Sequence, residues 1–137
     1  MNDNTIKEIQ QIVLKFRDAR DWRRFHHPKD LSMSIAIEAA ELMELFQWKD
    51  TKDSIGNKEK IEEEFKKIIN NPEFMQRINE ELADVLIYCL FFADVLNIDI
   101  GEIIKMKIRM NETKHSLKES ERKNKEADKV MAKVKMN

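Results

Sequence analysis

Carboxylates at helical spacing are the residues of this sequence with the clearest capacity for chemistry. Three of them, spaced three residues apart, are the only charged side chains of an otherwise largely apolar stretch at residues 31–48: Glu38, Glu41 and Glu44. Residues three apart on a helix share a face, so these side chains crowd one another. Two carboxylates about 4 Å apart repel by roughly 4 kcal/mol at an effective dielectric of about 20. Such a cluster needs a proton, water or a cation.

A second acidic pair, Glu81 and Asp84, precedes an apolar run at residues 85–93. Two largely apolar helices that each carry such a pair can bring four carboxylates together when they pack. Oxygen-only clusters suit hard divalent ions, above all Mg²⁺, which keeps waters and shares a phosphate with the protein. An acidic pair on a charged helix is usually a solvated face, but the apolar flanks and the duplicated pattern favour a metal site here.

The composition favours a single all-helical protein. The chain has 137 residues, of which 37% are charged, and only two Gly and two Pro, so long helices are favoured over β-structure with its many turns. A formal net charge of −1 leaves no excess of positive charge for a general nucleic-acid binder. The single Cys89 provides no disulfide framework. We find neither a signal sequence nor an apolar run of membrane-spanning length, and we expect a cytoplasmic protein.

The periodicity of apolar residues predicts the elements that carry these acids. We expect helices at residues 5–20, 31–48, 58–69, 72–96 and 99–114. Thr5 and Glu8 form a capping-box pattern, Asp30 is a good N-cap for the first acidic helix, and Pro72 suits the first position of the second. Residues 118–137 carry seven Lys or Arg against four Asp or Glu, which predicts a charged tail or a marginal helix after one helical domain at residues 1–117.

Aromatic and basic residues gather just before the first acidic helix, at residues 20–30. Trp22 and Phe25 either pack over helix ends or form a platform for a nucleobase, with cationic neighbours near the phosphates. The sequence leaves both interpretations open.

Four motifs, taken together, resemble the MazG-like nucleoside triphosphate pyrophosphohydrolases, and most closely the dCTP pyrophosphatase branch of that family. They are RDWxxFHxP at residues 20–28, ExxE at 38–41, LFQWK at 45–49 and EELADVLIY at 80–88. The acidic pairs alone are weakly specific, but with the two tryptophan segments the match is strong. The resemblance extends over roughly residues 16–114.

The resemblance implies an all-α fold: a bundle of four to five helices of the all-α NTP pyrophosphatase type, working as an intertwined homodimer or a dimer of dimers. It also implies that residues 1–117 are a catalytic domain for Mg²⁺-dependent cleavage of a nucleoside triphosphate to the monophosphate and pyrophosphate. We expect dCTP or a related deoxynucleotide as substrate, and a role in house-cleaning of the nucleotide pool.

The resemblance also implies roles for individual residues. The Mg²⁺ ligands would be Glu38, Glu41, Glu81 and Asp84, with Glu38 or Glu41 activating the attacking water. Positions around the base and sugar would be Trp22, His26 and Trp48, with Tyr88 one turn beyond Asp84. Positions that reach the phosphates would be Lys107, Asn111 and, as a weaker candidate, Lys114.

Three departures separate the chain from the pattern of that branch. The connection from Trp48 to Glu81 is longer than in close relatives, which could alter the rim of the site or the subunit contact. Lys114-His115-Ser116 replaces the usual Lys-Tyr-Pro after the last helix. Asp30 stands where the branch usually has Asn, which keeps an N-cap but could change a contact near the base.

Two other functions remain open from the sequence. A carboxylate-bridged di-iron bundle needs two Glu-x-x-His motifs, and the chain has only one, from Glu112 to His115. A non-enzymatic helical interaction module would use the aromatic residues and the eight Met residues for a partner groove, although Met is equally common as core filler.

Overall fold

The computed structural model describes residues 5–52 and 54–134, and these form six α-helices, one short 3₁₀ helix and no strand. In chain order they are α1 (Ile6–Asp18), η1 (Trp22–Phe25), α2 (Pro28–Glu44), α3 (Lys58–Ile69), α4 (Pro72–Val95), α5 (Ile100–Lys114) and α6 (Leu117–Val134). The predicted all-α class is confirmed. Of residues 118–137, predicted to be a charged tail or a marginal helix, those up to 134 are helical, and 135–137 lie outside the described residues.

The start of α1 follows the predicted capping box. The Thr5 hydroxyl accepts a hydrogen bond from the Glu8 backbone N–H at 3.3 Å, and the Glu8 carboxylate accepts one from the Thr5 N–H at 2.7 Å. Two N–H groups that the helix itself cannot satisfy are therefore paired.

The start of α2 differs from the prediction, because Asp30 is not its N-cap. The helix begins at Pro28, and His27 is the N-cap: its backbone is extended and its Nδ1 accepts from the Lys29 N–H at 3.2 Å. Proline suits the first helical position, since its fixed φ is already helical and its missing N–H would have no partner there. Asp30 lies two residues further on, inside the first turn.

The end of α2 also differs, since the helix stops at Glu44 rather than near Trp48. The Phe46 N–H donates to the Met43 carbonyl, and the Lys49 N–H to the Phe46 carbonyl, both at 3.0 Å. These bonds span three residues instead of four, so the chain finishes in tighter turns.

The start of α4 agrees with the prediction that Pro72 occupies its first position. Asn71 is the N-cap, and its side-chain oxygen accepts a hydrogen bond from the Phe74 N–H at 3.0 Å. The long second acidic helix is therefore confirmed, with 24 residues.

The described chain divides into two compact units. The first comprises residues up to 49 together with 68–101, and the second comprises residues 50–67 and those from 102 onward. The boundary that we predict near residue 117 stays a prediction.

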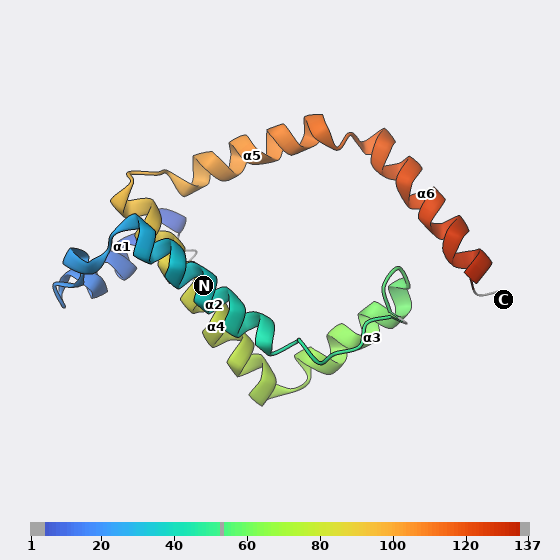
Figure 1. The fold of residues 1–137 in the computed structure, drawn as a ribbon, viewed down its shortest axis with the longest axis horizontal. Helices are drawn as coiled ribbons and strands as arrows, with labels where there is room; N and C mark the ends of the chain where they lie inside the picture. The colour runs from blue at the N-terminus through green and yellow to red at the C-terminus, as the bar shows by residue number, and fades with distance from the viewer. Residues whose placement is uncertain (1–4, 53, 135–137) are drawn as a thin grey trace. The chain divides into compact units, whose positions relative to one another are not determined.

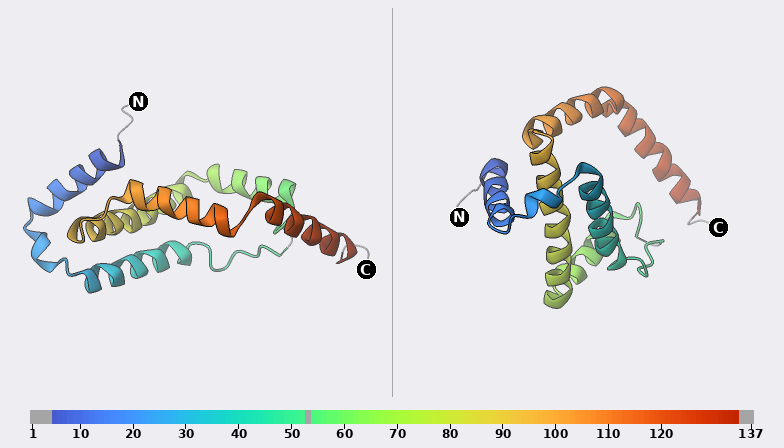
Figure 2. Two further views of the ribbon diagram at one scale, coloured as in Figure 1. Left: turned by 90° about the horizontal axis from the view of Figure 1, so that it is seen from above. Right: turned by 60° about the vertical axis from the view of Figure 1, so that its left-hand side comes forward.

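The core of the first unit lies between α2 and α4, which run side by side in Figures 1 and 2, with α1 against α4. The two helices are antiparallel: Phe46, just after α2, packs on Phe74 near the start of α4, with ring centroids 5.5 Å apart. The buried apolar residues are concentrated toward the other end of the pair: Leu31, Leu90, Phe91 and Ala93. This pairing positions the acidic faces described below.

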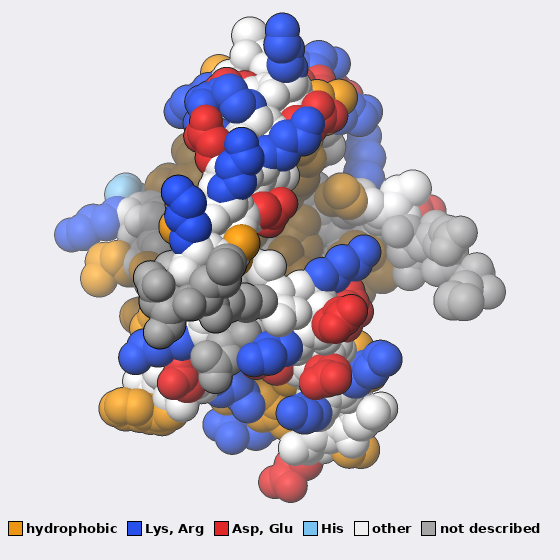
Figure 3. Space-filling model, turned by 90° about the vertical axis from the view of Figure 1, so that its right-hand side faces the viewer, with side chains coloured by type: hydrophobic (Ala, Val, Ile, Leu, Met, Phe, Trp, Pro, Cys, Tyr) orange, Lys and Arg blue, Asp and Glu red, His pale blue; other side chains and the backbone are white. Residues whose placement is uncertain are grey.

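In the second unit, α6 is rich in charges that pair along its own surface. Arg122 contacts Glu119 at 2.7 Å and Glu126 at 2.6 Å. Exposed pairs of this kind contribute little to stability. On the face shown in Figure 3, basic and acidic side chains are interspersed.

Among the described helices, none combines the length and apolar character needed to cross a membrane.

Candidate functional site

Three carboxylates from the two packed helices come together. Glu38 and Glu41 lie one turn apart on α2, and Glu81 lies on α4; each offers an oxygen, and these oxygens lie within 4.8 Å of one another. The spacing of three residues puts the first two on one face of α2, and the antiparallel packing brings α4 opposite them.

The charges of this cluster oppose one another. The pKa of Glu38 is raised, first by partial burial and then by the negative charges of Glu41, Asp84 and Glu81. Burial followed by Glu41 and Asp84 likewise raises the pKa of Glu81, against a smaller opposing effect of Arg77. Asp84 is exposed and lies outside the group of three, but its charge acts on both. The four predicted ligands therefore form one electrostatic group.

The donor set of this group fits a hard divalent cation. It offers carboxylate oxygens from two helices and contains no histidine or cysteine among the described residues. Mg²⁺ and Ca²⁺ prefer such oxygen ligands, whereas a di-iron site built on Glu-x-x-His motifs would bring histidines into the group. A bound cation would also offset the repulsion that, together with burial, raises the pKa values of Glu38 and Glu81.

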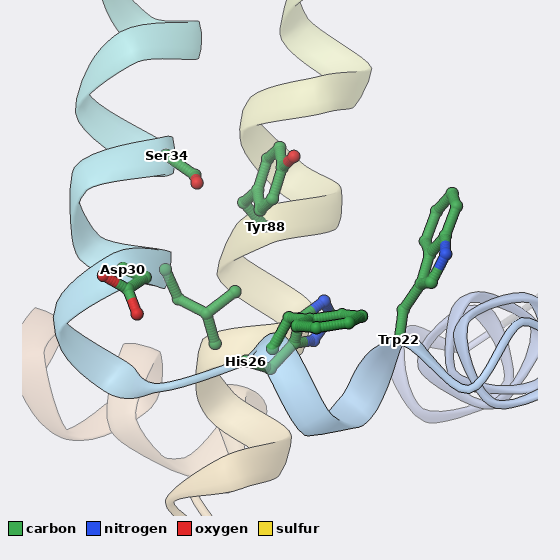
Figure 4. Close-up of a pocket in the computed structure, with 7 residues that line it drawn as sticks. Trp22, His26, Asp30, Ser34 and Tyr88 are labelled. Atoms are coloured by element: carbon green, nitrogen blue, oxygen red, sulfur yellow. The ribbon is translucent and has the colours of Figure 1, made fainter.

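A pocket of about 280 Å³ lies beside the same two helices. Figure 4 shows Asp30 and Ser34 on α2, Tyr88 on α4, and Trp22 and His26 from the segment that precedes α2. Phe25 and Leu31 complete its lining. Its volume is near the lower end of the roughly 300–1,000 Å³ typical of small-molecule sites.

His26 lines this pocket and also packs against the core residue Phe91. Its ring packs on Phe91 with centroids 4.6 Å apart, and its Nδ1 is buried without a hydrogen-bond partner among the described residues. Burial, followed by the positive charge of Arg17, lowers the pKa of His26. The imidazole is therefore held toward its neutral form.

The aromatic residues before α2 both pack near a helix end and line the pocket, and their role as a platform for a nucleobase stays a prediction. Trp22 packs edge-on against Phe16 of α1, with ring centroids 5.7 Å apart, so it covers a helix end. It also lines the pocket, as does Phe25. Trp22 is 44% exposed and Phe25 is 68% exposed.

The pocket and the acidic cluster follow one another along α2 and α4. On α2 the pocket residues Asp30 and Ser34 come before the acidic residues Glu38 and Glu41. On α4, which runs in the opposite direction, the pocket residue Tyr88 comes after the acidic residues Glu81 and Asp84. Ser34 and Glu38 are four residues apart, a rise of about 6 Å. An aromatic pocket thus lies one helical turn from a group of carboxylates.

The sequence matches the profile of the MazG-like family over residues 33–130, which is well over half of the chain. The chain belongs to the MazG-like family.

Individual relatives and a solved structure agree with this membership. The MazG-like chain is 31% identical over 111 residues to dCTP pyrophosphatase 1 of Homo sapiens and 29% identical over 114 residues to that of Bos taurus. These matches cover 81% and 83% of the chain but only 59% and 61% of the relatives. A crystal structure of a pyrophosphatase from Archaeoglobus fulgidus is 39% identical, with a TM-score of 0.67, and the match covers 85% of the chain and 96% of that protein.

Four of the substrate-binding residues that we expect in this MazG-like chain are not among the residues that line the pocket. Trp48 follows α2 and is 89% exposed. Lys107, Asn111 and Lys114 are exposed residues of α5 in the second unit. Their roles stay predictions from the resemblance.

Two pocket residues of the MazG-like chain are absent from the sequence-based set: Leu31 and Ser34. A helical signal for Ser34 does exist, since it lies four residues before Glu38 and therefore on the same face of α2. Leu31 gives no such signal, because its apolar spacing is that of a core residue and it is indeed buried.

Proposed function

We propose that this chain is a divalent-metal-dependent nucleoside triphosphate pyrophosphohydrolase, which cleaves a (d)NTP to the (d)NMP and pyrophosphate. The observation that carries the proposal is the order of sites along α2 and α4, an aromatic pocket followed by a carboxylate cluster. A base held among Trp22, Phe25 and Tyr88 would extend its phosphates along the helix pair toward the acids. The names of the relatives, dCTP pyrophosphatase 1 and a pyrophosphatase, support the same activity.

Glu38, Glu41, Glu81 and Asp84 would hold the metal, which we propose to be Mg²⁺ because of their oxygen-only donor set. Bound there, Mg²⁺ would supply positive charge to the phosphate oxygens. Asp84, although outside the tightest group, acts electrostatically on Glu38 and Glu81, which supports its inclusion.

The carboxylates also supply the proton acceptor that hydrolysis needs. A water oxygen forms a bond to the α-phosphorus, the α–β phosphoanhydride bond breaks, and pyrophosphate leaves with the bonding electron pair. Glu38 or Glu41 accepts the proton that the water loses, a general-base role. Lys107, Asn111 and Lys114 of α5 would contact the phosphates and stabilise their charge.

The substrate proposed is dCTP or a related deoxynucleotide, in keeping with the names of the curated relatives. Nucleotide-pool house-cleaning would follow from that activity. Our expectation of a cytoplasmic location stays a prediction.

We also propose that the chain works as a homodimer or a dimer of dimers. Large apolar side chains remain exposed on the helices that form the first unit, among them Met33 and Ile37 of α2, Leu82 and Leu86 of α4, and Ile9 and Ile12 of α1. Exposed apolar surface repeated over several helices is typical of an interface. Sedimentation equilibrium tests this proposal: a monomer at micromolar concentration would contradict it.

Pyrophosphate release from a panel of NTPs and dNTPs, with Mg²⁺ and with EDTA, tests the activity. We expect metal-dependent release, with one deoxynucleotide well ahead. Absence of release from every nucleotide would overturn the proposal and would favour the helical interaction module.

A further inference from the structure

The carboxylate of Asp94 lies in the last turn of α4, where the helix dipole disfavours a negative charge. Two arginines from outside α4 offset that effect. Arg17 of α1 donates a hydrogen bond from Nη1 to Oδ2 of Asp94 at 2.6 Å, and Arg23 of η1 donates from Nη1 to the same oxygen at 3.4 Å. One carboxylate oxygen therefore joins α4 to both α1 and η1.

The contact with η1 lies beside residues that line the pocket. Three of them come from the segment at residues 22–26: Trp22, Phe25 and His26. Figure 4 shows this segment on one side and Tyr88 of α4 on another. Arg23 directly follows Trp22 in the chain, so its hydrogen bond to Asp94 ties the segment to the helix that carries Tyr88.

A second connection runs from Asp94 to the pocket through the core. The guanidinium carbon of Arg17, which Asp94 holds, lies 5.8 Å from the centre of the Phe91 ring. Phe91 is 4% exposed, and its ring packs on His26 with centroids 4.6 Å apart and on Tyr88 with centroids 6.0 Å apart. One buried ring thus supports pocket residues from two elements, and the Arg17 pair supports that ring.

Stability alone does not account for the contact of Arg23. Asp94 already has Arg17 as its close partner, at 2.6 Å, so its charge is compensated without Arg23. The Arg23 side chain is 62% exposed, and ion pairs of such exposed groups contribute little to stability. The contact does restrict where η1 lies relative to α4.

We propose that Asp94 is a positioning residue for the base pocket, which holds the segment at residues 22–26 against α4 through Arg23 and through the contact of Arg17 with Phe91. The inference rests on the proposed function, in which the pocket receives the base. Neither Asp94 nor Arg23 touches the substrate in this role. Their effect is preorganisation: a segment that is already held in place loses less conformational freedom when a ligand binds.

The test measures dissociation constants for deoxycytidine and dCTP by calorimetry in EDTA, in the wild-type chain and in the Arg23→Gln variant. We expect the variant to bind both ligands more weakly by the same factor, about twofold to fivefold, which corresponds to the contribution of a partly exposed ion pair. Deoxycytidine has no phosphate, so an equal factor for both ligands separates positioning from a direct contact of Arg23 with phosphate. A loss confined to dCTP would overturn the proposal.

The Arg24→Gln variant is the matched control. Arg24 is the next residue of η1 and is 64% exposed, but its ion-pair partner is Asp21, just before η1, and not a residue of α4. It loses the same charge from the same short helix without loosening η1 from α4, so it should bind both ligands as wild type does. The Arg23→Lys variant retains a cationic donor and should keep more of the affinity than Arg23→Gln does.

Two further readouts distinguish positioning from a purely structural role. In steady-state cleavage, Arg23→Gln should raise KM and leave kcat close to that of wild type, since the reacting groups are unchanged. In an Asp94→Ala background, shown by circular dichroism to be folded, Arg23→Gln should cause no further loss of dCTP affinity, because residues that act through one contact are not additive. If Asp94→Ala does not fold, the comparison of Arg23→Gln with Arg24→Gln decides alone.

An unchanged dissociation constant for deoxycytidine in Arg23→Gln, or an equal loss in Arg23→Gln and Arg24→Gln, would overturn the role of Asp94. These binding measurements need no cleavage. Failure of the wild-type chain to cleave any nucleotide would overturn the proposed function, and the role of Asp94 in holding the pocket would still be decided by binding.

Discussion

Arg17 of α1 donates a hydrogen bond from Nη1 to Oδ2 of Asp94, near the end of α4, at 2.6 Å. The Arg17 side chain is 1% exposed and that of Asp94 is 21% exposed, so this ion pair is largely removed from water. It ties α1 to the helix that carries Glu81 and Tyr88. Burial, followed by the charge of Arg17, lowers the pKa of His26 in the pocket.

We expect Asp94→Ala to lower the free energy of unfolding by about 3 kcal/mol, because the buried Arg17 guanidinium loses the less exposed of its two carboxylate partners. Chemical denaturation followed by circular dichroism measures this change. Asp18→Ala is the control: Asp18 pairs with the same arginine at 2.7 Å but is 53% exposed, so its loss should cost less than about 1 kcal/mol. Equal effects of the two variants would contradict the prediction.

Glu41→Gln should remain folded and lose most of its turnover, with kcat reduced about 100-fold or more, because the carboxamide can neither accept the water proton nor bind a cation as strongly. Steady-state pyrophosphate release measures this loss. Glu44→Gln, which removes the exposed acid one turn further along α2, should stay close to wild type. Near-normal turnover by Glu41→Gln would refute the assignment.

Glu38→Gln should raise the melting temperature of the chain in EDTA, because it removes a carboxylate whose pKa is raised by partial burial and by its neighbours' negative charges. Wild type should gain more stability than this variant when Mg²⁺ is added, since a ligand that binds only the folded state stabilises it. Differential scanning calorimetry with and without Mg²⁺ checks both expectations. Glu63→Gln, which removes an exposed acid of α3, should behave like wild type. A melting temperature below that of wild type for Glu38→Gln in EDTA would contradict the repulsion among the carboxylates of the cluster.

Trp22→Ala should weaken nucleotide binding by roughly tenfold, because stacking of a base on an aromatic ring contributes about 1–3 kcal/mol. Calorimetric titration with dCTP in EDTA measures the dissociation constant. Because Trp22 also packs on Phe16, the unfolding midpoint of the variant should be recorded alongside. An unchanged dissociation constant would show that the pocket does not receive the base.

Stability should fall with decreasing pH in part through His26. Its pKa in the folded state lies below the ordinary value of 6.5, so the unfolded chain binds the proton more tightly. The contribution is therefore complete above pH 6.5 and is lost as the pH falls toward the lowered pKa. We expect His26→Asn to flatten the stability profile just below pH 6.5, whereas His115→Asn, at an exposed position, should keep the wild-type slope.

Local signals in the sequence were sufficient for most of the helices. The capping box at Thr5, the proline at residue 72 and the apolar periodicity act within a few residues, and so the predicted elements agree with the structure. Both ends of α2 were exceptions. At its start, three competing signals lie within four residues: His27, Pro28 and Asp30. The N-cap is the residue whose backbone is still extended just before the helix. Only the structure shows that this residue is His27.

The sequence by itself determined that Glu38 and Glu41 share one helical face, and that Glu81 and Asp84 share another, because the helical period is a local property of the chain. Only the tertiary structure decided which of these helical faces lie opposite each other. The antiparallel packing of α2 on α4 brings Glu81 to the α2 acids and Ser34 to the same pocket as Tyr88, and a different register would separate them. Register depends on how side chains more than 40 residues apart fill one interface, here around Leu31 and Phe91, and no local pattern encodes that.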